Sequence, residues 1–559
     1  MRQALRWLAW MLLLSGLLSF NLWWPTPMVW PDHRVSPEFV ILWCALLAWA
    51  RWGGTVPPRL LSWVALLYTL LVLGRYGDVV SPALFGRPVN LYWDGLQIPR
   101  FLWVSAQAAP WWLSALAVLA VGLLLWALHA LVRRGLWVVA HEAAPAALRS
   151  PTALAASGFF ALSVVGNYAG VQATWPYISR PVLPAWVHQA GLVADALSPA
   201  RVAEILPPAT AVDRAMAAGA AATSSTPVAE RPMALLGGRD LFLVMLESVG
   251  AVTYDDAQMA AALAPRRQTF GRDVLAAGKG VVSAFVRSPT FAGGSDLAHL
   301  GLLSGMDLSQ PRHHDLLLTT QRPTLISLMR QQGYQTFGVY HGVFWDWPER
   351  AFYGFDTYVD ARDLKYRGPP LGLWYSPDQF AFARFEQMHP RQAGGKPRFV
   401  FFPTITSHLP FSPVPPYQPD WARILTEQPF EADITARLLA QKPDWLNMRP
   451  GYIGMVDYTY QWLGGYLAQP FARDGVYLLV GDHQPASSVT GEGASWDVPV
   501  YLVTSDPQIL QRFEALGFAR GMEPPRTPLG GMHELTGLLI KALSPQPLVD
   551  DVGPPRAKR

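Results

Sequence analysis

Long apolar runs dominate the first third of the chain. The two strongest are residues 5–24 (LRWLAWMLLLSGLLSFNLWW) and 111–132 (WWLSALAVLAVGLLLWALHALV). At 1.5 Å per residue, a helix of either length is about 30 Å long, which matches the hydrocarbon thickness of a bilayer. Weaker runs occupy residues 38–52, 59–75 and 152–169. The pattern predicts an α-helical anchor of about five transmembrane helices, with the two chain ends on opposite sides of the membrane.

The arginines between these runs predict the orientation of the anchor. With the N-terminus inside, the inner segments carry Arg2, Arg6, Arg51, Arg59, Arg133, Arg134 and Arg149, and the outer segments carry Arg34, Arg75, Arg87 and Arg100. The positive-inside rule therefore favours an extracytoplasmic position for everything after residue 169. We expect a multi-pass protein of a bacterial-type inner (cytoplasmic) membrane. Losing one span from this count would reverse the orientation, whereas losing two would not.

A cleaved signal peptide is the alternative interpretation of the first apolar run. No small-residue cleavage site follows residues 5–24, so we favour a retained helix.

From residue 240 onward, short apolar runs alternate with amphipathic stretches. The expected strands cover residues 241–246, 280–286, 336–341, 398–405, 476–481 and 498–503. Helical stretches such as 323–332 and 452–468 separate them. Wholly apolar strands between helices are typical of an α/β domain with a largely parallel sheet covered by helices on both faces.

These patterns divide the chain into four regions. Residues 199–236 are rich in Ala, Pro, Ser and Thr, a composition typical of a tether rather than a core. We expect a transmembrane anchor at 1–170, a juxtamembrane segment and linker at 171–238, an extracytoplasmic α/β domain at 239–545 and a tail at 546–559.

Composition and charge exclude several classes of protein. Hydrophobic residues make up 51% of the 559 residues and charged residues only 15%, whereas soluble domains average about 25% charged. The formal net charge is +4, from 44 Lys+Arg and 40 Asp+Glu, and no basic block occurs, which argues against nucleic acid as a partner. Cys44 is the single cysteine and lies in an apolar run. An intramolecular disulfide and a cysteine-based metal site are therefore excluded.

Ionisable residues follow the expected strands at the point where each strand ends. Glu247 comes directly after one apolar strand, and Asp482 and His483 come directly after another. Buried carboxylates are costly unless a cation neutralises them. Two carboxylates and one imidazole suit a single Zn²⁺ or Mn²⁺ and leave a position open for a nucleophile or a substrate oxygen. The alternative for each residue alone is a helix cap or a structural ion pair.

The segment 287–307 (RSPTFAGGSDLAHLGLLSGMD) adds a candidate nucleophile. Its Gly-Gly-Ser leads into a helical pattern, so Ser295 is expected at a helix N-terminus, where free N–H groups and the helix dipole favour a phosphoryl group. The alternative is an ordinary N-cap serine after a glycine turn. His299, one turn later, faces either the pocket or solvent.

These motifs resemble the alkaline phosphatase/sulfatase superfamily, in particular its membrane-anchored branch of lipoteichoic acid synthases and phosphoglycerol or phosphoethanolamine transferases. FLVMLESVG (242–250) is similar to the opening metal motif of that branch, and LLVGDHQP (478–485) to its closing Asp-His pair. GGSDLAHLGLLSG (293–305) resembles the nucleophile helix of the related phosphoglycerate mutases. The resemblance covers roughly residues 240–540.

The resemblance implies specific roles for site residues. It assigns Glu247, Ser295, Asp482 and His483 to the metal, with Ser295 as catalytic nucleophile. TSHLPF (406–411) and YHGVFWDWPERAFYGFDTY (340–358) resemble substrate-side motifs. They imply that the substrate is bound by four side chains: His408, Trp345, Arg350 and His341.

Two departures from the lipoteichoic acid synthases are visible. Those enzymes use threonine as nucleophile, which makes Thr290 a rival to Ser295. They also carry an arginine two residues after the tryptophan. That position is Trp347 here, and Arg350 is the nearest replacement.

The resemblance implies a membrane-bound, metal-dependent transferase. The donor is a phospholipid, and the transferred group is its phosphoglycerol or phosphoethanolamine headgroup. A phosphoserine carries this group to the acceptor, which is an envelope glycan or glycolipid. A sulfatase-like hydrolase of phosphate or sulfate esters is one alternative. A non-catalytic protein that binds an envelope polymer is another. The Cys/Ser-x-Pro-x-Arg sequence of true sulfatases is absent at Ser288-Pro289.

Overall fold

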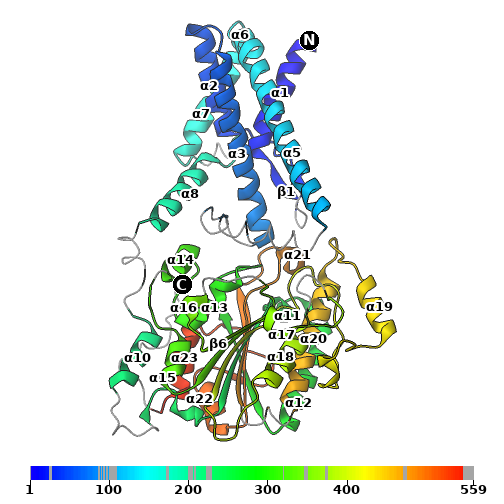
Figure 1. The fold of residues 1–559 in the computed structure, drawn as a ribbon. Coiled ribbons are helices and arrows are strands. Elements are labelled where there is room, and N and C mark those ends of the chain that lie inside the picture. The colour runs from blue at the N-terminus through cyan, green and yellow to red at the C-terminus, as the bar shows by residue number, and fades with distance from the viewer. Residues whose placement is uncertain are drawn as a thin grey trace. The chain divides into compact units, whose positions relative to one another are not determined.

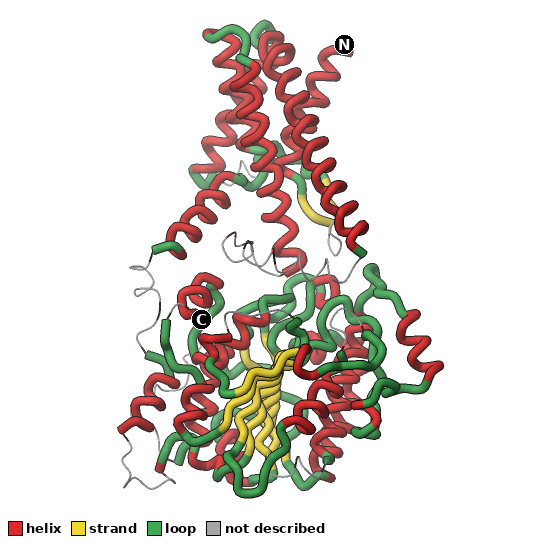
Figure 2. Tube along the Cα trace, viewed as in Figure 1, coloured by secondary structure: helices red, strands yellow, loops and turns green. Residues whose placement is uncertain are grey.

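The computed structural model describes residues 2–23, 28–85, 110–171, 176–198, 209–221, 230–318, 320–344, 350–371, 376–469 and 475–545, together with residues 89, 91, 95, 99, 206 and 472. The chain divides into two compact units, Met1–Ser198 and Pro199–Arg559 (Figures 1 and 2).

The N-terminal unit is a bundle of helices. Its helices are α1 (Arg2–Ser19), α2 (Pro37–Trp52), α3 (Pro58–Phe85), α5 (Trp111–Val138), α7 (Pro151–Tyr168) and α8 (Leu183–Ala196). A π-helical turn (Val139–Ala143) and α6 (Ala144–Ala147) continue α5, and β1 (Asn21–Trp23) pairs antiparallel with β2 (Met28–Trp30). Buried apolar side chains of α1, α2, α3 and α5 form one cluster.

The outer surface of this bundle is also apolar. On α5, Leu116, Val118, Leu124 and Trp126 are all more than half exposed. A helix that is apolar on every side does not suit contact with water, and such helices are typical of a membrane span or a deeply buried core. Since these side chains are not covered within the bundle, lipid is the environment that fits them.

Helices form at all five positions where apolar runs occur, but their lengths differ from the prediction. Among the described helices, only Pro58–Ser81 and Trp111–Ala147 are long and apolar enough to cross a membrane. The prediction of five spans is therefore wrong in number. The cap at Ser36 and the end at Gly53 limit α2 to 16 residues, and the first turns of α1 carry Arg2 and Arg6. Two spans return the chain to the side on which it began, whereas five do not.

The C-terminal unit is built on one eight-stranded sheet with the order β10-β4-β9-β8-β3-β7-β5-β6. The strands are β3 (Asp240–Leu246), β4 (Gly280–Arg287), β5 (Gln335–Tyr340), β6 (Thr357–Asp360), β7 (Arg398–Pro403), β8 (Gly475–Gly481), β9 (Asp497–Thr504) and β10 (Ala519–Arg520). All six predicted strands are confirmed, whereas β6 and β10 were not predicted. Strand β6 has four residues and β10 has two, which are too few to show a periodic pattern.

The sheet is mostly parallel, as predicted, with one interruption. Strands β8, β3, β7, β5 and β6 run parallel to one another. Strand β9 is antiparallel to both β8 and β4, so β4 again runs in the direction of β8. The carboxyl ends of β4, β8, β3, β7 and β5 therefore share one edge, where loops of such sheets gather ligands.

Helices cover both faces of the sheet (Figure 1). The described helices of this unit are α10 (Ala211–Ala221), α11 (Val252–Asp255), α12 (Ala257–Ala276), α13 (Ser295–Ser304), α14 (Pro311–Leu318), α15 (Leu325–Gln331), α16 (Arg350–Tyr353), α17 (Ala361–Leu364), α18 (Asp378–Met388), α19 (Ala432–Ala440), α20 (Arg449–Leu467), α21 (Ser487–Thr490), α22 (Pro507–Glu514) and α23 (Met532–Leu543), with 3-10 turns at Ala234–Leu236 and Arg423–Leu425. Alternate residues of β3 point to opposite faces. Phe242 and Val244 belong to the core cluster that includes α12, α18 and α20.

Candidate metal centre and active site

Three side chains of the kind that bind metals meet at the ends of two adjacent strands. Glu247 follows β3, and Asp482 and His483 follow β8. These strands are parallel, with Leu246 opposite Gly481. The equal register brings the next residue of each strand to the same level. All three side chains are buried, and one ligand atom from each lies within 4.8 Å of the others.

Backbone N–H groups hold one oxygen of Asp482 and leave the other without a partner. The N–H groups of Ser248 and His483 donate to Asp482 Oδ1 at 2.7 and 2.6 Å. Asp482 Oδ2 is buried and, within the described part of the chain, accepts no hydrogen bond. A buried carboxylate oxygen without a partner is costly, so this atom fits a bound cation.

The hydrogen bonds of His483 determine which ring nitrogen faces the group. Its Nδ1 lies 2.8 Å from the carbonyl oxygen of Gln484, which only accepts, so Nδ1 carries the proton. Its Nε2 therefore presents a lone pair. That atom lies 3.5 Å from Asp482 Oδ2 and 3.7 Å from Glu247 Oε1. A backbone carbonyl that fixes the tautomer in this way is typical of metal-binding histidines.

The two carboxylates have opposite pKa shifts. Burial, reinforced by the negative charge of Glu247, raises the pKa of Asp482 well above its ordinary value. Burial also opposes ionisation of Glu247, but hydrogen bonds with Ser248 and Asp482 and the positive charges that His483 and His408 carry when protonated together lower the pKa of Glu247. The cluster therefore resists carrying two negative charges at once.

The donor set fits one divalent cation. Two carboxylates and an imidazole are ligands that Zn²⁺ and Mn²⁺ share, and the partnerless Oδ2 of Asp482 provides a position for the ion. A cation would relieve the repulsion between the carboxylates. Its positive charge would also lower the pKa of both carboxylates, including that of Asp482, which is raised in the metal-free group.

Ser295 lies directly beside these residues. It is the first residue of the ten-residue helix α13 and is half-buried. Its Oγ lies 3.3 Å from Glu247 Oε2 and 3.1 Å from His483 Nε2. Gly293 and Gly294 precede it with φ of 137° and 71°, values that favour glycine, so the Gly-Gly pair allows this entry into the helix.

Thr290, the rival nucleophile, has a different environment. Its side chain is fully buried, and its hydroxyl donates a hydrogen bond to the carbonyl oxygen of Gly293. It therefore stabilises the turn before Ser295, and its proton is already committed to a backbone acceptor.

His299 is buried beside the group rather than exposed to solvent. Its Nε2 lies 3.9 Å from Asp482 Oδ2, and its ring packs edge-to-face on Phe401. Burial lowers the pKa of His299 to about 3, so the ring is neutral at physiological pH. Neither ring nitrogen has a hydrogen-bond partner in the described part of the chain. Its ligand atoms fall outside the 4.8 Å group of three.

His341 follows β5 and contacts a carboxylate that we did not predict. Its Nε2 lies 2.9 Å from Oδ1 of Asp378, and both side chains are fully buried. The same oxygen accepts the N–H groups of Ile405 and Thr406 at 2.8 and 3.1 Å. His341 is thus part of a fixed support for the loop after β7.

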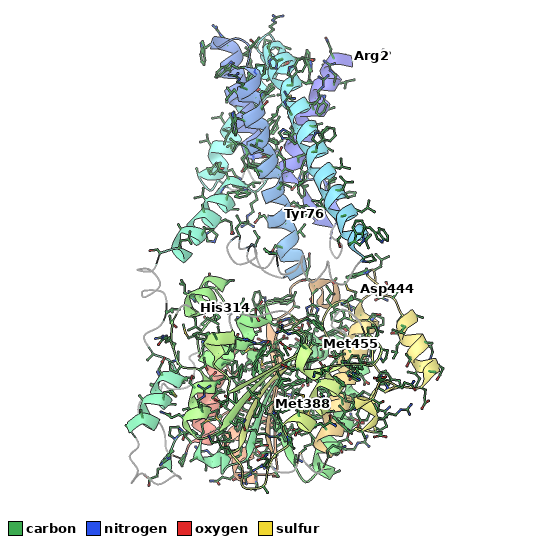
Figure 3. The ribbon with its side chains drawn as sticks, in the orientation of Figure 1. Arg2, Tyr76, His314, Met388, Asp444 and Met455 are labelled. Carbon is green, nitrogen blue, oxygen red and sulfur yellow. The ribbon has the colours of Figure 1, made fainter. Side chains whose placement is uncertain are left out.

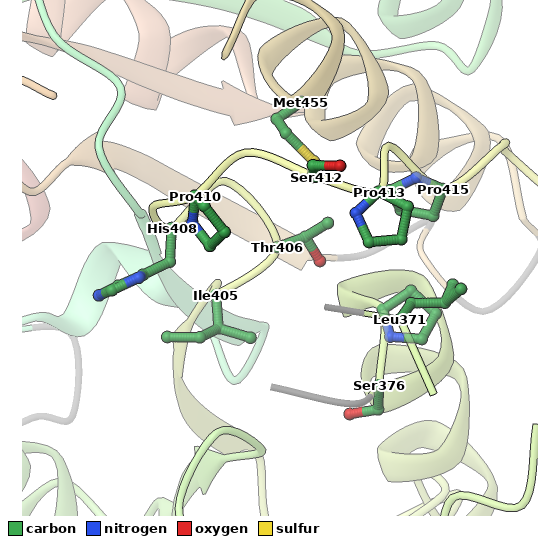
Figure 4. A pocket seen from close by; sticks show the side chains of 11 residues that line it. Leu371, Ser376, Ile405, Thr406, His408, Pro410, Ser412, Pro413, Pro415 and Met455 are labelled. Carbon is green, nitrogen blue, oxygen red and sulfur yellow. The ribbon is translucent and has the colours of Figure 1, made fainter. Parts of the chain in front are cut away.

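That loop carries His408 into the wall of a pocket (Figure 4). The pocket is lined by Leu371, Ser376, Pro377, Ile405, Thr406, His408, Pro410, Ser412, Pro413, Pro415 and Met455. The ring of His408 points away from Leu371 and Ser376 (Figure 4), and a protonated His408 would lower the pKa of Glu247. His408 therefore lines the pocket and interacts electrostatically with one member of the group of three.

The remaining two predicted residues are Trp345 and Arg350. Trp345 lies outside the described residues. Arg350 is exposed, and its guanidinium lies 5.3 Å from the centre of the Tyr358 ring.

Sequence reasoning missed two residues that connect the site. Asp378 lies 37 residues from His341 in the chain, and no local motif links them. Gln484 directly follows the Asp-His pair, and its carbonyl oxygen also accepts the N–H of Ala292 at 3.0 Å, which ties the Ser295 loop to β8. The position of Gln484 directly after Asp482 and His483 was the feature of the sequence that could have indicated its role.

A comparison with protein families decides the assignment. Residues 289–496 match the sulfatase family model, a range that includes Ser295, His408, Asp482 and His483. This match identifies residues 289–496, rather than the whole chain, as a sulfatase-family region of the alkaline phosphatase/sulfatase superfamily, which is a superfamily of enzymes. No curated protein sequence matches the chain.

Several solved structures of this superfamily are similar to the chain. Lipoteichoic acid synthase LtaP from Listeria monocytogenes is 14% identical, with 59% of this chain and 78% of that chain covered and a TM-score of 0.35. Phosphoglycerol transferase GacH from Streptococcus pyogenes, in complex with sn-glycerol-1-phosphate, is 11% identical, with 64% and 86% covered and a TM-score of 0.34. The C-terminal periplasmic domain of EcEptC from Escherichia coli is 12% identical, with 48% and 73% covered and a TM-score of 0.34. TM-scores of this size support no statement about the function of this chain.

The Asp482→Asn substitution tests the metal centre of this superfamily member. Asparagine keeps Oδ1 with its two N–H donors and replaces the partnerless Oδ2 with a neutral amide. We expect metal affinity to fall by at least about 100-fold, because both a ligand and a charge are lost. Metal content by atomic spectrometry measures this loss. The Asp457→Asn variant, which alters a half-buried carboxylate paired with Arg266, should keep its metal.

The same substitution has an expected effect on the metal-free protein. Because the pKa of folded Asp482 is raised, its contribution to stability is present at low pH and is lost as the pH rises. At neutral pH, metal-free Asp482→Asn should therefore unfold at the same temperature as the metal-free natural protein, or a higher one. Stoichiometric metal in this variant would show that the ion binds elsewhere.

Proposed function

We propose that the chain is a membrane-bound, metal-dependent transferase of a phospholipid headgroup. The donor is a phospholipid, the group is of the phosphoglycerol or phosphoethanolamine type, and the acceptor is a hydroxyl of an envelope glycan or glycolipid. The group passes through a covalent phosphoserine at Ser295.

The observation that carries this proposal is the position of the Ser295 hydroxyl. Its Oγ is within hydrogen-bond distance of both Glu247 and His483, and it opens the helix α13. Free N–H groups at a helix N-terminus favour a bound phosphoryl group, and the adjoining Glu247 carboxylate is the first acceptor for the hydroxyl proton. A hydroxyl placed in this way suits attack on phosphorus.

Each residue of the proposed site has a separate role in the reaction. Glu247, Asp482 and His483 would hold the cation, which supplies charge stabilisation for the phosphoryl oxygens and lowers the pKa of a nearby hydroxyl. Ser295 Oγ forms a bond to phosphorus as the bond to the diacylglycerol oxygen breaks, and diacylglycerol leaves with a proton. The acceptor hydroxyl then attacks phosphorus, and Ser295 recovers its proton.

His408 and the pocket beside it are the proposed substrate side. His408 lines the pocket, and its charge acts on Glu247, so a headgroup there would be close to the reacting phosphorus. The loop that carries His408 is held in place by Asp378, which accepts the N–H groups of Ile405 and Thr406. Arg350 and Trp345 are proposed only from their positions in the motif.

A hydrolase remains the second candidate, because the matching family model is that of the sulfatases. It would use the same residues with water as the acceptor. Incubation of the purified protein with a headgroup-labelled phospholipid, with and without glycan or glycolipid acceptors, separates the two. We expect label on the acceptor. Release of label into water at the same rate with and without an acceptor would favour the hydrolase.

Ser295, and not Thr290, is expected to carry the phosphoryl group. Ser295→Ala should abolish turnover but keep the metal, since the three other ligands remain. Thr290→Ser should retain substantial turnover, because a hydroxyl can still donate to Gly293. Mass spectrometry of the enzyme trapped with its donor locates the adduct. An adduct on Thr290, or normal turnover by Ser295→Ala, would remove Ser295 from the mechanism.

We further propose that the catalytic domain is extracytoplasmic. The support is the chemistry of the acceptors, since envelope glycans lie outside the cytoplasm. The count of loop arginines assumed five spans, so it no longer predicts the orientation of a chain with two spans.

Reporter fusions at both ends test this location. An alkaline phosphatase reporter after Arg559 should be active, and with two spans a reporter before Met1 should report the same compartment. A cytoplasmic reporter that is active after Arg559 would contradict both the location and the envelope acceptor. Reporters in different compartments would show an odd number of spans.

A further inference from the structure

The C-terminal unit exposes three large apolar side chains within the short stretch 439–446. We call it the apolar tip, defined by Leu439 at the end of α19 and by Trp445 and Leu446 in the segment before α20. These side chains are 49%, 60% and 95% exposed. In the described part of this unit, only Leu275 is another large apolar side chain with comparable exposure. Clustered exposure of this kind marks an interaction surface, whereas single exposed residues do not.

The tip is held in a defined conformation. The carboxylate of Asp444, labelled in Figure 3, accepts the N–H groups of Leu446 and Asn447 at 3.1 and 3.0 Å. This short turn presents Trp445 and Leu446 outward. An exposed Trp-Leu pair that is fixed by its own backbone loses little conformational entropy when it binds.

Contacts connect the tip to the edge of the sheet that carries the site. The side-chain oxygen of Gln441 accepts the N–H of Val414, which lies between two prolines that line the pocket. After the tip, α20 begins, and the Tyr452 hydroxyl donates to the carbonyl oxygen of Ser248, the residue after Glu247. Met455, one turn further (Figure 3), lines the pocket. The segments on either side of the tip are therefore joined to elements that line the pocket and carry the site.

We propose that the apolar tip enters the headgroup region of a phospholipid bilayer and holds the pocket at the lipid surface. This inference rests on the proposed function, since it names where the lipid donor is met. Tryptophan and leucine together suit the boundary between headgroups and acyl chains. The same chain carries two membrane-length helices, so a bilayer is always near the domain.

A bilayer fits the tip better than a protein partner. Stable protein interfaces bury at least about 1,200 Å², and three side chains are far short of that area. An anchored domain needs no such area, because the anchor already holds it at high local concentration and the tip has only to orient it. The donor also keeps its acyl chains in the membrane, so the pocket has to open there.

Site-specific fluorescence tests the immersion of the tip. The full-length protein with Cys44→Ala has no other cysteine, so Leu446→Cys accepts a single environment-sensitive dye. In nanodiscs of phosphatidylethanolamine and phosphatidylglycerol, we expect a blue shift of the dye and quenching by doxyl-labelled lipids. Gln392→Cys is the matched control, because residue 392 is exposed in the loop before β7, at the opposite edge of the sheet. Equal quenching at both positions, or none at 446, would overturn the proposal, as would a blue shift insensitive to doxyl lipids, which would indicate a protein contact.

Kinetics provide a second readout that separates docking from chemistry. The Trp445→Ser/Leu446→Ser variant should raise KM for a donor in the bilayer by about tenfold and leave kcat unchanged. A water-soluble phosphodiester should be turned over at the natural rate by the same variant, since neither residue touches the group of three. An unchanged KM would contradict docking. If the natural protein transfers no headgroup, the proposed function fails, and the quenching experiment still decides whether the tip meets lipid.

Discussion

Two buried carboxylates at the ends of neighbouring strands are the constraint on which the site depends. Glu247 and Asp482 are brought together because β3 and β8 are parallel and in register, and no apolar core can accept both charges. The raised pKa of Asp482 and its partnerless Oδ2 express this conflict. A divalent cation bound there would resolve this conflict, and the same ion would supply the chemistry of the site.

The surrounding loops hold that edge through backbone carbonyls. The Ser407 hydroxyl donates to the carbonyl oxygen of Glu247 at 2.6 Å, and the Ser288 hydroxyl donates to that of Asp482 at 2.5 Å. Gln484 joins the Ser295 loop to the same strand end. Four strand ends are thereby fixed to one another before any ligand binds. This rigidity matters because a nucleophile displaced by 1 Å loses much of its advantage.

Two features of the chain would serve the proposed phospholipid donor. Such a donor keeps its acyl chains in the bilayer, so an enzyme that acts on it gains from being anchored. The N-terminal unit supplies two helices long and apolar enough to cross a membrane. In the C-terminal unit, the proposed lipid contact of the apolar tip would orient the domain toward the same donor.

The chain itself determined the order and burial of the strands and the identity of the group of three. Apolar strands followed at once by Glu, Asp or His are a local pattern, and parallel strands end at one edge, so Glu247, Asp482, His483 and Ser295 could be placed together in advance. Tertiary structure alone decided the pairing of His341 with Asp378 and the burial of His299 beside Asp482, because both depend on contacts between distant segments. It also decided the number of membrane-length helices. Apolar runs reveal composition, whereas caps and terminal charges set how many residues a helix keeps, and therefore whether it can span a bilayer.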